Sequence, residues 1–359
     1  IEMNFGKSKM AQSYRNCRPS DRKLNPGASN ISRRAFLGNA AVGLGGLLCP
    51  GLALHQGAGS DAENLSAVRL RQAEKARVVI VRDPPVIRGR KVNREVVEEM
   101  VRRAVCLLTG KEDQTLAWKA LFSPKEKVAI KVNARHPPVA GNREVADAIV
   151  KGLKSAGVDE NRIIIFDFVE EELRRLGYKL NDSSKGVRCY AIRDYSEMKA
   201  GPVSVRLSKI VINEADAIIN VPAFRHHGLA GVTVSMKNHL GTIQNPRDLH
   251  RDTCLHVADL NALDPIRKKT RLIIADAILG QYDGGPSYRP QFVWEYAGLI
   301  AGADPVAVDT VAADELREQR QKKGIHGPIR PTIRYIHRAA ELGLGIADLK
   351  RINVVREPA

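Results

Sequence analysis

Cysteine is scarce in this chain of 359 residues, which has five cysteines and no Cys-x-x-Cys pair. Because iron–sulfur clusters are held by several closely spaced cysteines, we expect no iron–sulfur cluster built from this chain alone. Cys17 and Cys49 fall in an N-terminal leader, so Cys106, Cys189 and Cys254 remain in the rest of the chain. One disulfide with an odd thiol is compatible with three cysteines, and the spacing does not choose the pair.

Aromatic residues are also few, at 5%, and several common signatures are missing. There is no Gly-x-Ser-x-Gly, no His-Glu-x-x-His and no Gly-x-Gly-x-x-Gly, which removes the simplest assignments to hydrolases, zinc proteases and dinucleotide-binding enzymes. The low aromatic content and the lack of a recognised motif argue against a nucleic-acid partner. No stretch has the length and character of a transmembrane helix, so we expect no membrane span in the mature protein.

The first 59 residues have the organisation of an export signal. A basic leader precedes Arg33 and Arg34, and a modest apolar run follows at residues 40–54. This order is typical of a twin-arginine signal peptide, with Gly38 where a lysine is common. We therefore expect residues 1–59 to be the signal and leader, residues 60–76 a linker and residues 77–359 the folded domain. The expected location is periplasmic or extracytoplasmic, with the twin-arginine translocation machinery as a partner.

The formal net charge of the chain is +17. The leader contributes eight basic residues against Glu2 and Asp21, a net +6, so the remainder keeps about +11. A positive excess of this size favours anionic partners. We expect a small anionic ligand or an envelope polymer.

Short β-branched runs alternate with helical patterns beyond residue 77. The expected strands cover residues 78–81, 127–132, 163–166, 187–192, 203–207, 217–221, 271–275, 296–301 and 351–355. The expected helices cover residues 93–108, 142–155, 170–176, 208–215, 253–263, 305–316 and 331–342. The alternation predicts an α/β fold with a mostly parallel sheet flanked by helices, in one body or in two lobes.

Residues 220–243 concentrate groups that bind ligands or transfer protons. Among them are Arg225, His226, His227, Lys237, Asn238 and His239. Lys237 is suited to hold a phosphate or carboxylate, or to act as a base if burial lowers its pKa. The histidines His226, His227 and His239 also fit a transition-metal site, although their spacing is no recognised zinc signature. Residues 232–236 fit a strand and a helix equally well.

Further polar residues follow the expected strands at or just beyond their carboxyl ends. They are Asn133, Asp167, His226, His227, Asp276 and Asp304. Parallel strands place their carboxyl ends at one edge of the sheet, where ligands bind. Lys131 and Asn133 share one face of their strand, which suits an anion. Asp276, Asp304 or Asp309 would complete a metal shell if a metal were bound.

Several motifs in the expected order resemble the domain-of-unknown-function family numbered 362. They are VAIKVN at 128–133, NVP at 220–222, GVTVSMKNHLG at 231–241, IADAI at 274–278, the Gly-Pro pair at 285–286 and ADPVAVD at 303–309. The resemblance implies one site made by Lys131, Asn133, His227, Lys237, Asn238, Asp276, Asp304 and Asp309. Some members carry appended four-iron ferredoxin segments, which implies an association with redox proteins. This chain lacks those cysteines, so a redox role would need a partner protein or another cofactor.

The leading hypothesis is an exported enzyme that acts on a small anionic substrate. The expected catalytic residues are Lys237, His227 and Asp276, and the expected substrate-binding residues are Lys131, Asn133, Asn238, Asp304 and Asp309. A metal held by His226, His227 and His239 would assist. The alternative is a non-catalytic accessory subunit that binds a metal or ligand for a periplasmic redox system.

Overall fold

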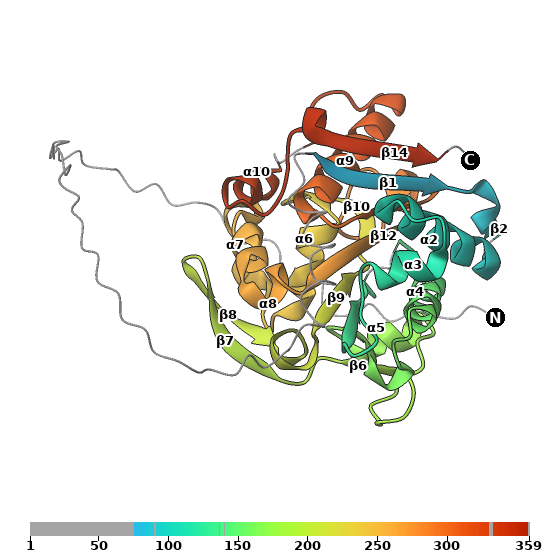
Figure 1. Ribbon diagram of the computed structural model, residues 1–359. Coiled ribbons are helices and arrows are strands. Elements are labelled where there is room, and N and C mark those ends of the chain that lie inside the picture. The colour runs from blue at the N-terminus through green and yellow to red at the C-terminus, as the bar shows by residue number, and fades with distance from the viewer. Residues whose placement is uncertain (1–74, 90, 136, 140, 330–332, 358–359) are drawn as a thin grey trace, which may run out of the picture. The chain divides into compact units, whose positions relative to one another are not determined.

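The computed structural model describes residues 75–357, with gaps at residues 90, 136, 140 and 330–332 (Figure 1). These residues belong to one compact unit, Gln56–Ala359. The expected export signal and most of the expected linker lie outside the described residues. No helix in the described ranges has both the length and the apolar character needed to cross a bilayer.

The unit is built on a ten-stranded sheet. Its main path runs β14 (Ile352–Glu357), β1 (Ala76–Arg82), β13 (Val293–Gly302), β12 (Thr270–Gln281), β9 (Ala217–Asn220), β4 (Val128–Lys131), β5 (Ile163–Asp167) and β6 (Arg188–Ala191). Off this path, β10 (Ala223–His227) pairs with β12 and with β11 (Gly231–Thr233). Two small sheets pair β2 (Ile87–Arg88) with β3 (Lys91–Val92), and β7 (Tyr195–Ala200) with β8 (Val203–Ser208).

Most neighbouring strands of the large sheet run parallel, so the predicted α/β class with a mostly parallel sheet is confirmed. One strand of the main path breaks the pattern, because β13 is antiparallel to both of its neighbours, β1 and β12. The carboxyl end of β13 therefore lies at the opposite edge of the sheet from the carboxyl ends of β4, β5 and β9.

Helices cover both faces of the sheet (Figure 1). One layer holds α2 (Arg94–Thr109), α3 (Gln114–Lys119) and α4 (Arg143–Ser155), and the other holds α6 (Ser235–Asn238), α7 (Val257–Ala262), α8 (Asp264–Arg267), α9 (Pro305–Lys322) and α10 (Arg334–Glu341). Strand β1 shows why two layers form, because Val79 and Val81 join the first core while Val78 and Ile80 join the second. Alternate side chains of a strand point to opposite faces, so a strand that is apolar throughout needs cover on both.

Most of the expected elements are present, whereas α3 and β7 were not predicted. The helices α2 and α4 begin next to Asn93 and Asn142, and α5 (Glu170–Arg175) follows β5. Residues 232–236, which fitted a strand and a helix equally well, are divided between the two, since β11 ends at Thr233 and α6 begins at Ser235. Strand β10 was not predicted, and β12 continues well beyond the expected end at residue 275.

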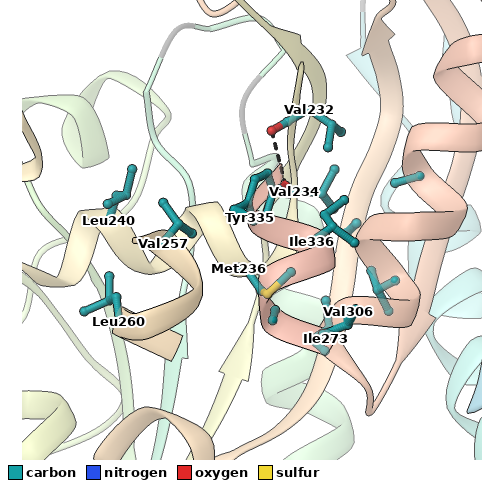
Figure 2. Packing of buried hydrophobic residues seen from close by; sticks show 14 of the residues in the cluster. Val232, Val234, Met236, Leu240, Val257, Leu260, Ile273, Val306, Tyr335 and Ile336 are labelled. Carbon is teal, nitrogen blue, oxygen red and sulfur yellow. Dashed lines mark hydrogen bonds between the residues drawn. The ribbon is translucent and has the colours of Figure 1, made fainter. Parts of the chain in front are cut away.

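The segment that enters α6 is anchored by apolar packing (Figure 2). Val232, Val234 and Met236 are fully buried and pack in the cluster that includes Tyr335 and Ile336 of α10. The single hydroxyl proton of Tyr335 is shared between the carbonyl oxygen of Val232 at 3.3 Å and the carboxylate of Asp309 at 3.1 Å. Full burial of each aliphatic side chain contributes about 1.5–3 kcal/mol, so this packing fixes the backbone that carries Lys237.

Candidate functional site

Strand β10 separates two adjacent histidines. Side chains alternate along a strand, so Arg225 and His227 share one face while His226 points to the other. There, Nε2 of His226 lies 3.7 Å from Oδ1 of Asp283, which also accepts a hydrogen bond from Arg320. His226 therefore belongs to a separate ionic cluster.

His227 is held as a neutral hydrogen-bond donor. Its Nδ1 accepts from the backbone N–H groups of Leu229 and Ala230 at 3.1 and 3.2 Å. Burial, reinforced by the positive charge of Lys237, lowers the pKa of His227 to about 2. A neutral imidazole that accepts at Nδ1 carries its proton on Nε2. Nε2 of His227 therefore presents a proton, whereas the base or metal ligand that the sequence suggested would need a free lone pair there.

Lys237 lies in the same group of side chains. It is 6% exposed, and its Nζ lies 3.3 Å from Nε2 of His250. The ring of His250 stacks on that of His227, with centroids 5.8 Å apart. Burial lowers the pKa of Lys237 to about 8, and the positive charge of Arg225 acts in the same direction. Lys237, His250 and His227 therefore form one contiguous basic cluster.

Arg225 is the second buried cation of this site. Its Nη1 donates to the carbonyl oxygens of Arg135 and Val139 at 3.0 and 3.3 Å, and Nη2 donates to Oδ1 of Asn133 at 3.4 Å. Burial, followed by the charge of Arg135, lowers the pKa of Arg225 to about 10. Within the described residues no carboxylate forms an ion pair with Arg225 or with Lys237.

A row of amides connects Arg225 to the start of α6. Asn133 accepts from Arg225 and donates from Nδ2 to Oδ1 of Asn238 at 2.9 Å. Asn238 donates to Oδ1 of Asn220 at 2.7 Å, and Asn220 donates to the carbonyl oxygen of Ser235 at 2.8 Å. The structure thus brings the predicted residues Asn133 and Asn238 together beside Lys237.

Lys131 lies under this network and is closed off from a ligand. It is 1% exposed, and its Nζ donates to Oδ1 of Asp167 at 2.7 Å and to the carbonyl oxygen of Val132 at 2.6 Å. The other carboxylate oxygen of Asp167 accepts from the N–H of Ala134 at 2.6 Å. A side chain at Gly241 would bring its Cβ within 2.9 Å of Nζ, so the pair needs a glycine there. We assign Lys131 a supporting role.

Asp309 fixes the start of α6. Its carboxylate accepts from the N–H groups of Ser235 and Met236 at 2.6 and 3.1 Å, and from the hydroxyl of Tyr335 at 3.1 Å. Burial is the main reason that the pKa of Asp309 rises to about 7. Asp309 therefore positions the turn that carries Lys237, and its donors are backbone and tyrosine groups.

Asp276 lies beside the start of β10, paired with Ala223, whereas Asp304 lies at the opposite edge of the sheet. Asp276 stands inside β12 rather than at its end, and its carboxylate accepts from the N–H and the side-chain amide of Asn142 at 2.5 and 2.8 Å. Burial raises the pKa of Asp276 to about 6. Asp304 caps α9 through the N–H groups of Val306 and Ala307, at the edge reached by antiparallel β13. The structure therefore gives both aspartates anchoring contacts.

The predicted trio His226, His227 and His239 is not assembled. His239 turns to Thr270 at the start of β12, with its Nε2 3.5 Å from the hydroxyl oxygen. In the part of the chain that the structure describes, no three His, Cys, Asp or Glu side chains are placed to hold a metal. The described cysteines Cys106, Cys189 and Cys254 are free, so no disulfide joins them.

Two residues of the site were left out of the predicted set. Arg225 stands two positions before His227, and an extended reading of residues 223–227 would have placed both on one face. His250 lies beyond residues 220–243, so it was not part of the stretch that the sequence singled out.

The fold and this geometry define an α/β protein with a buried cationic site at the edge of its sheet. A family model described as "Domain of unknown function (DUF362)" matches residues 128–314, just over half of the chain. The chain belongs to this family. The matched segment contains Lys131, Arg225, His227, Lys237 and Asp309.

No curated protein matches the chain. Among solved structures, a crystal structure of a Thermotoga maritima protein from the Northeast Structural Genomics Consortium is similar, with 14% identity and a TM-score of 0.40. The match covers 66% of this chain and 60% of that chain, so this chain spans under two thirds of its length.

Proposed function

We propose that this protein is an enzyme that binds a small anionic substrate between Arg225, His227 and Lys237. One observation carries the proposal: two buried cations are near enough for the charge of Arg225 to lower the pKa of Lys237, and no described carboxylate is paired with either. A buried charge without a counterion costs several kcal/mol. A bound anion would supply that counterion.

Lys237 is the proposed acid–base group. With a pKa of about 8, roughly a tenth of its side chain is the free amine at pH 7. A free amine can take a proton from a substrate carbon, and the resulting ammonium can return it. The Nε2 lone pair of His250 accepts from Nζ at 3.3 Å and holds the amine in one direction.

His227 would stabilise the charge that develops on the substrate. Its neutral Nε2–H would donate to an oxygen as that oxygen gains negative charge, and it would not compete with Lys237 for the proton. The reaction class that this set supports is proton transfer next to a carbonyl or carboxyl group. Lys131, Asn133, Asn238, Asp276 and Asp309 would hold this arrangement in place.

Deuterium exchange tests the proposal. The full chain is incubated in D2O with a panel of small carboxylates and phosphates, and NMR follows exchange of their carbon-bound protons. We expect exchange with at least one compound, and a loss of at least 100-fold in Lys237→Met. Lys151→Met, which removes a largely exposed lysine, is the matched control. Binding without exchange in the wild type would favour the accessory ligand-binding subunit.

We also propose that the protein is exported in the folded state through the twin-arginine pathway. The support is the sequence alone, with Arg33 and Arg34 ahead of an apolar run. In a cell with a functional twin-arginine system, Arg33→Lys/Arg34→Lys should retain the protein in the cytoplasm. Export of this variant at the wild-type level would contradict the proposal.

A further inference from the structure

The guanidinium of Arg225 has an unused edge. An arginine side chain has five N–H donors. Both Nη1 protons go to carbonyl oxygens, those of Arg135 and Val139, and one Nη2 proton goes to Asn133. Nε is buried and has no hydrogen-bond partner. The Nε proton and one Nη2 proton therefore remain, on two adjacent nitrogens.

A buried N–H without an acceptor gives up its water and gains nothing in return. Nε is also unpartnered in Arg103, Arg188 and Arg320, but those three guanidinium groups each pair with a carboxylate and Arg225 pairs with no described one. The side chain of Arg225 is only 3% exposed. The carbonyl and amide partners of Arg225 also fix the plane of its guanidinium, so the free N–H groups on Nε and Nη2 have a fixed orientation. These two features together point to a ligand that accepts two parallel hydrogen bonds.

We propose that the anion bound at this site is a carboxylate, held in bidentate fashion by Nε and Nη2 of Arg225. This inference rests on the proposed function, because it assigns a chemical class to the anion of the same site. A planar carboxylate matches the spacing and plane of two parallel N–H donors. Lys237 offers a point charge, which binds anions without selecting their shape.

The position of Arg225 also limits the length of the ligand. Arg225 and His227 lie two residues apart on one face of β10, a separation of about 7 Å along the strand. A short ligand that binds Arg225 through a carboxylate could therefore reach the N–H of His227 with an oxygen only a few bonds away. The ligand class is therefore a short carboxylic acid with a second oxygen function a few bonds from the carboxylate.

Isothermal titration of the full chain with malonate, acetate, inorganic phosphate and sulfate tests the inference. We expect malonate to bind more tightly than either tetrahedral anion. Arg225→Lys keeps the charge and removes the two parallel N–H donors, so malonate affinity should fall by at least 10-fold, with a smaller change for phosphate. Tighter binding of phosphate than malonate, or unchanged malonate affinity in Arg225→Lys, would overturn the assignment.

Lys237→Met separates this inference from the proposed function. If Arg225→Lys weakens malonate binding and Lys237→Met changes neither binding nor exchange, the carboxylate site stands and the catalytic proposal fails. If phosphate is preferred and Lys237→Met abolishes exchange, the catalytic proposal stands and the carboxylate assignment fails. Absence of binding for all four anions overturns the carboxylate site.

Because Arg225 is buried, Arg225→Lys needs a check that does not depend on a folded variant. A crystal structure of the wild-type protein grown with malonate provides it. We expect two carboxylate oxygens within about 3 Å of Nε and Nη2 of Arg225. Malonate bound elsewhere, with Nε still lacking an acceptor, would contradict the inference.

Discussion

Nζ of Lys237 lies 3.3 Å from Nε2 of His250, and the same ring donates its Nδ1 proton to the carbonyl oxygen of Pro246 at 2.7 Å. His250 therefore presents only a lone pair to Lys237, because its one proton is already used. Burial, followed by the positive charge of Lys237, lowers the pKa of His250 and keeps the ring neutral. This hydrogen bond orients the amine of Lys237.

We expect the wild type to gain stability relative to Lys237→Met as the pH rises from about 8 to about 10.5. Burial lowers the pKa of Lys237 from 10.5 to about 8 in the folded state. Between these values the unfolded chain binds more protons, so the free energy of unfolding rises with pH. The full change is on the order of 3 kcal/mol. Urea denaturation of both proteins across this range measures it.

Lys151→Met controls for the general effect of losing a positive charge, because Lys151 is largely exposed. A difference between wild type and Lys237→Met that stays constant from pH 8 to pH 10.5 would contradict the assignment of a perturbed Lys237.

Lys131→Met should destabilise the protein by about 3–5 kcal/mol, because it leaves the buried carboxylate of Asp167 without its cation. Lys154→Met is a matched control. Lys154 and Glu160 are also 2.7 Å apart but lie at the surface, so the loss there should be at most about 1 kcal/mol. Equal losses, measured by thermal or urea unfolding, would argue against a buried pair at Lys131.

Asp309→Asn should change how stability depends on pH. Burial raises the folded-state pKa of Asp309 from 3.8 to about 7. Between these values the folded state binds more protons, so the wild type loses stability with rising pH. The asparagine variant cannot titrate at this position and lacks this dependence on pH. The free energy of unfolding of the variant minus that of the wild type should rise by on the order of 4 kcal/mol from pH 4 to pH 7. A flat difference across this range is the contrary outcome.

Asn238→Leu should cost about 2–4 kcal/mol of stability. The amide of Asn238 accepts from Asn133 and donates to Asn220, and both partners are left without it. The exposed residue Asn353 of β14 provides the control, since Asn353→Leu should change stability by less than about 0.5 kcal/mol. Similar effects of the two substitutions would show that the amide row contributes little.

The ends of the parallel strands were predictable from the sequence. Apolar runs stop just before or beside Lys131, Asp167 and Asn220, and parallel neighbours bring such ends to one edge. The direction of β13 could not be predicted, because the apolar residues of a buried strand form the same pattern whichever way the strand runs. That is why Asp304 was expected at the wrong edge.

Side-chain partners were less predictable than strand ends. Nothing in the spacing of Lys131 and Asp167 shows that these residues form a buried pair. Strand β10 was missed because Arg225, His226 and His227 are unusual residues for a buried strand. Its burial depends on contacts with β11, β12 and the loop after β4, which local sequence does not encode.

The amides of Asn133, Asn238 and Asn220 all point the same way, with each oxygen turned towards the Arg225 end of the row. They form a head-to-tail line of dipoles whose negative end meets the guanidinium. Such a line holds a cation without carrying any net charge. The protein thereby stabilises Arg225 without cancelling its positive charge, and the positive potential of the site stays available to an incoming anion.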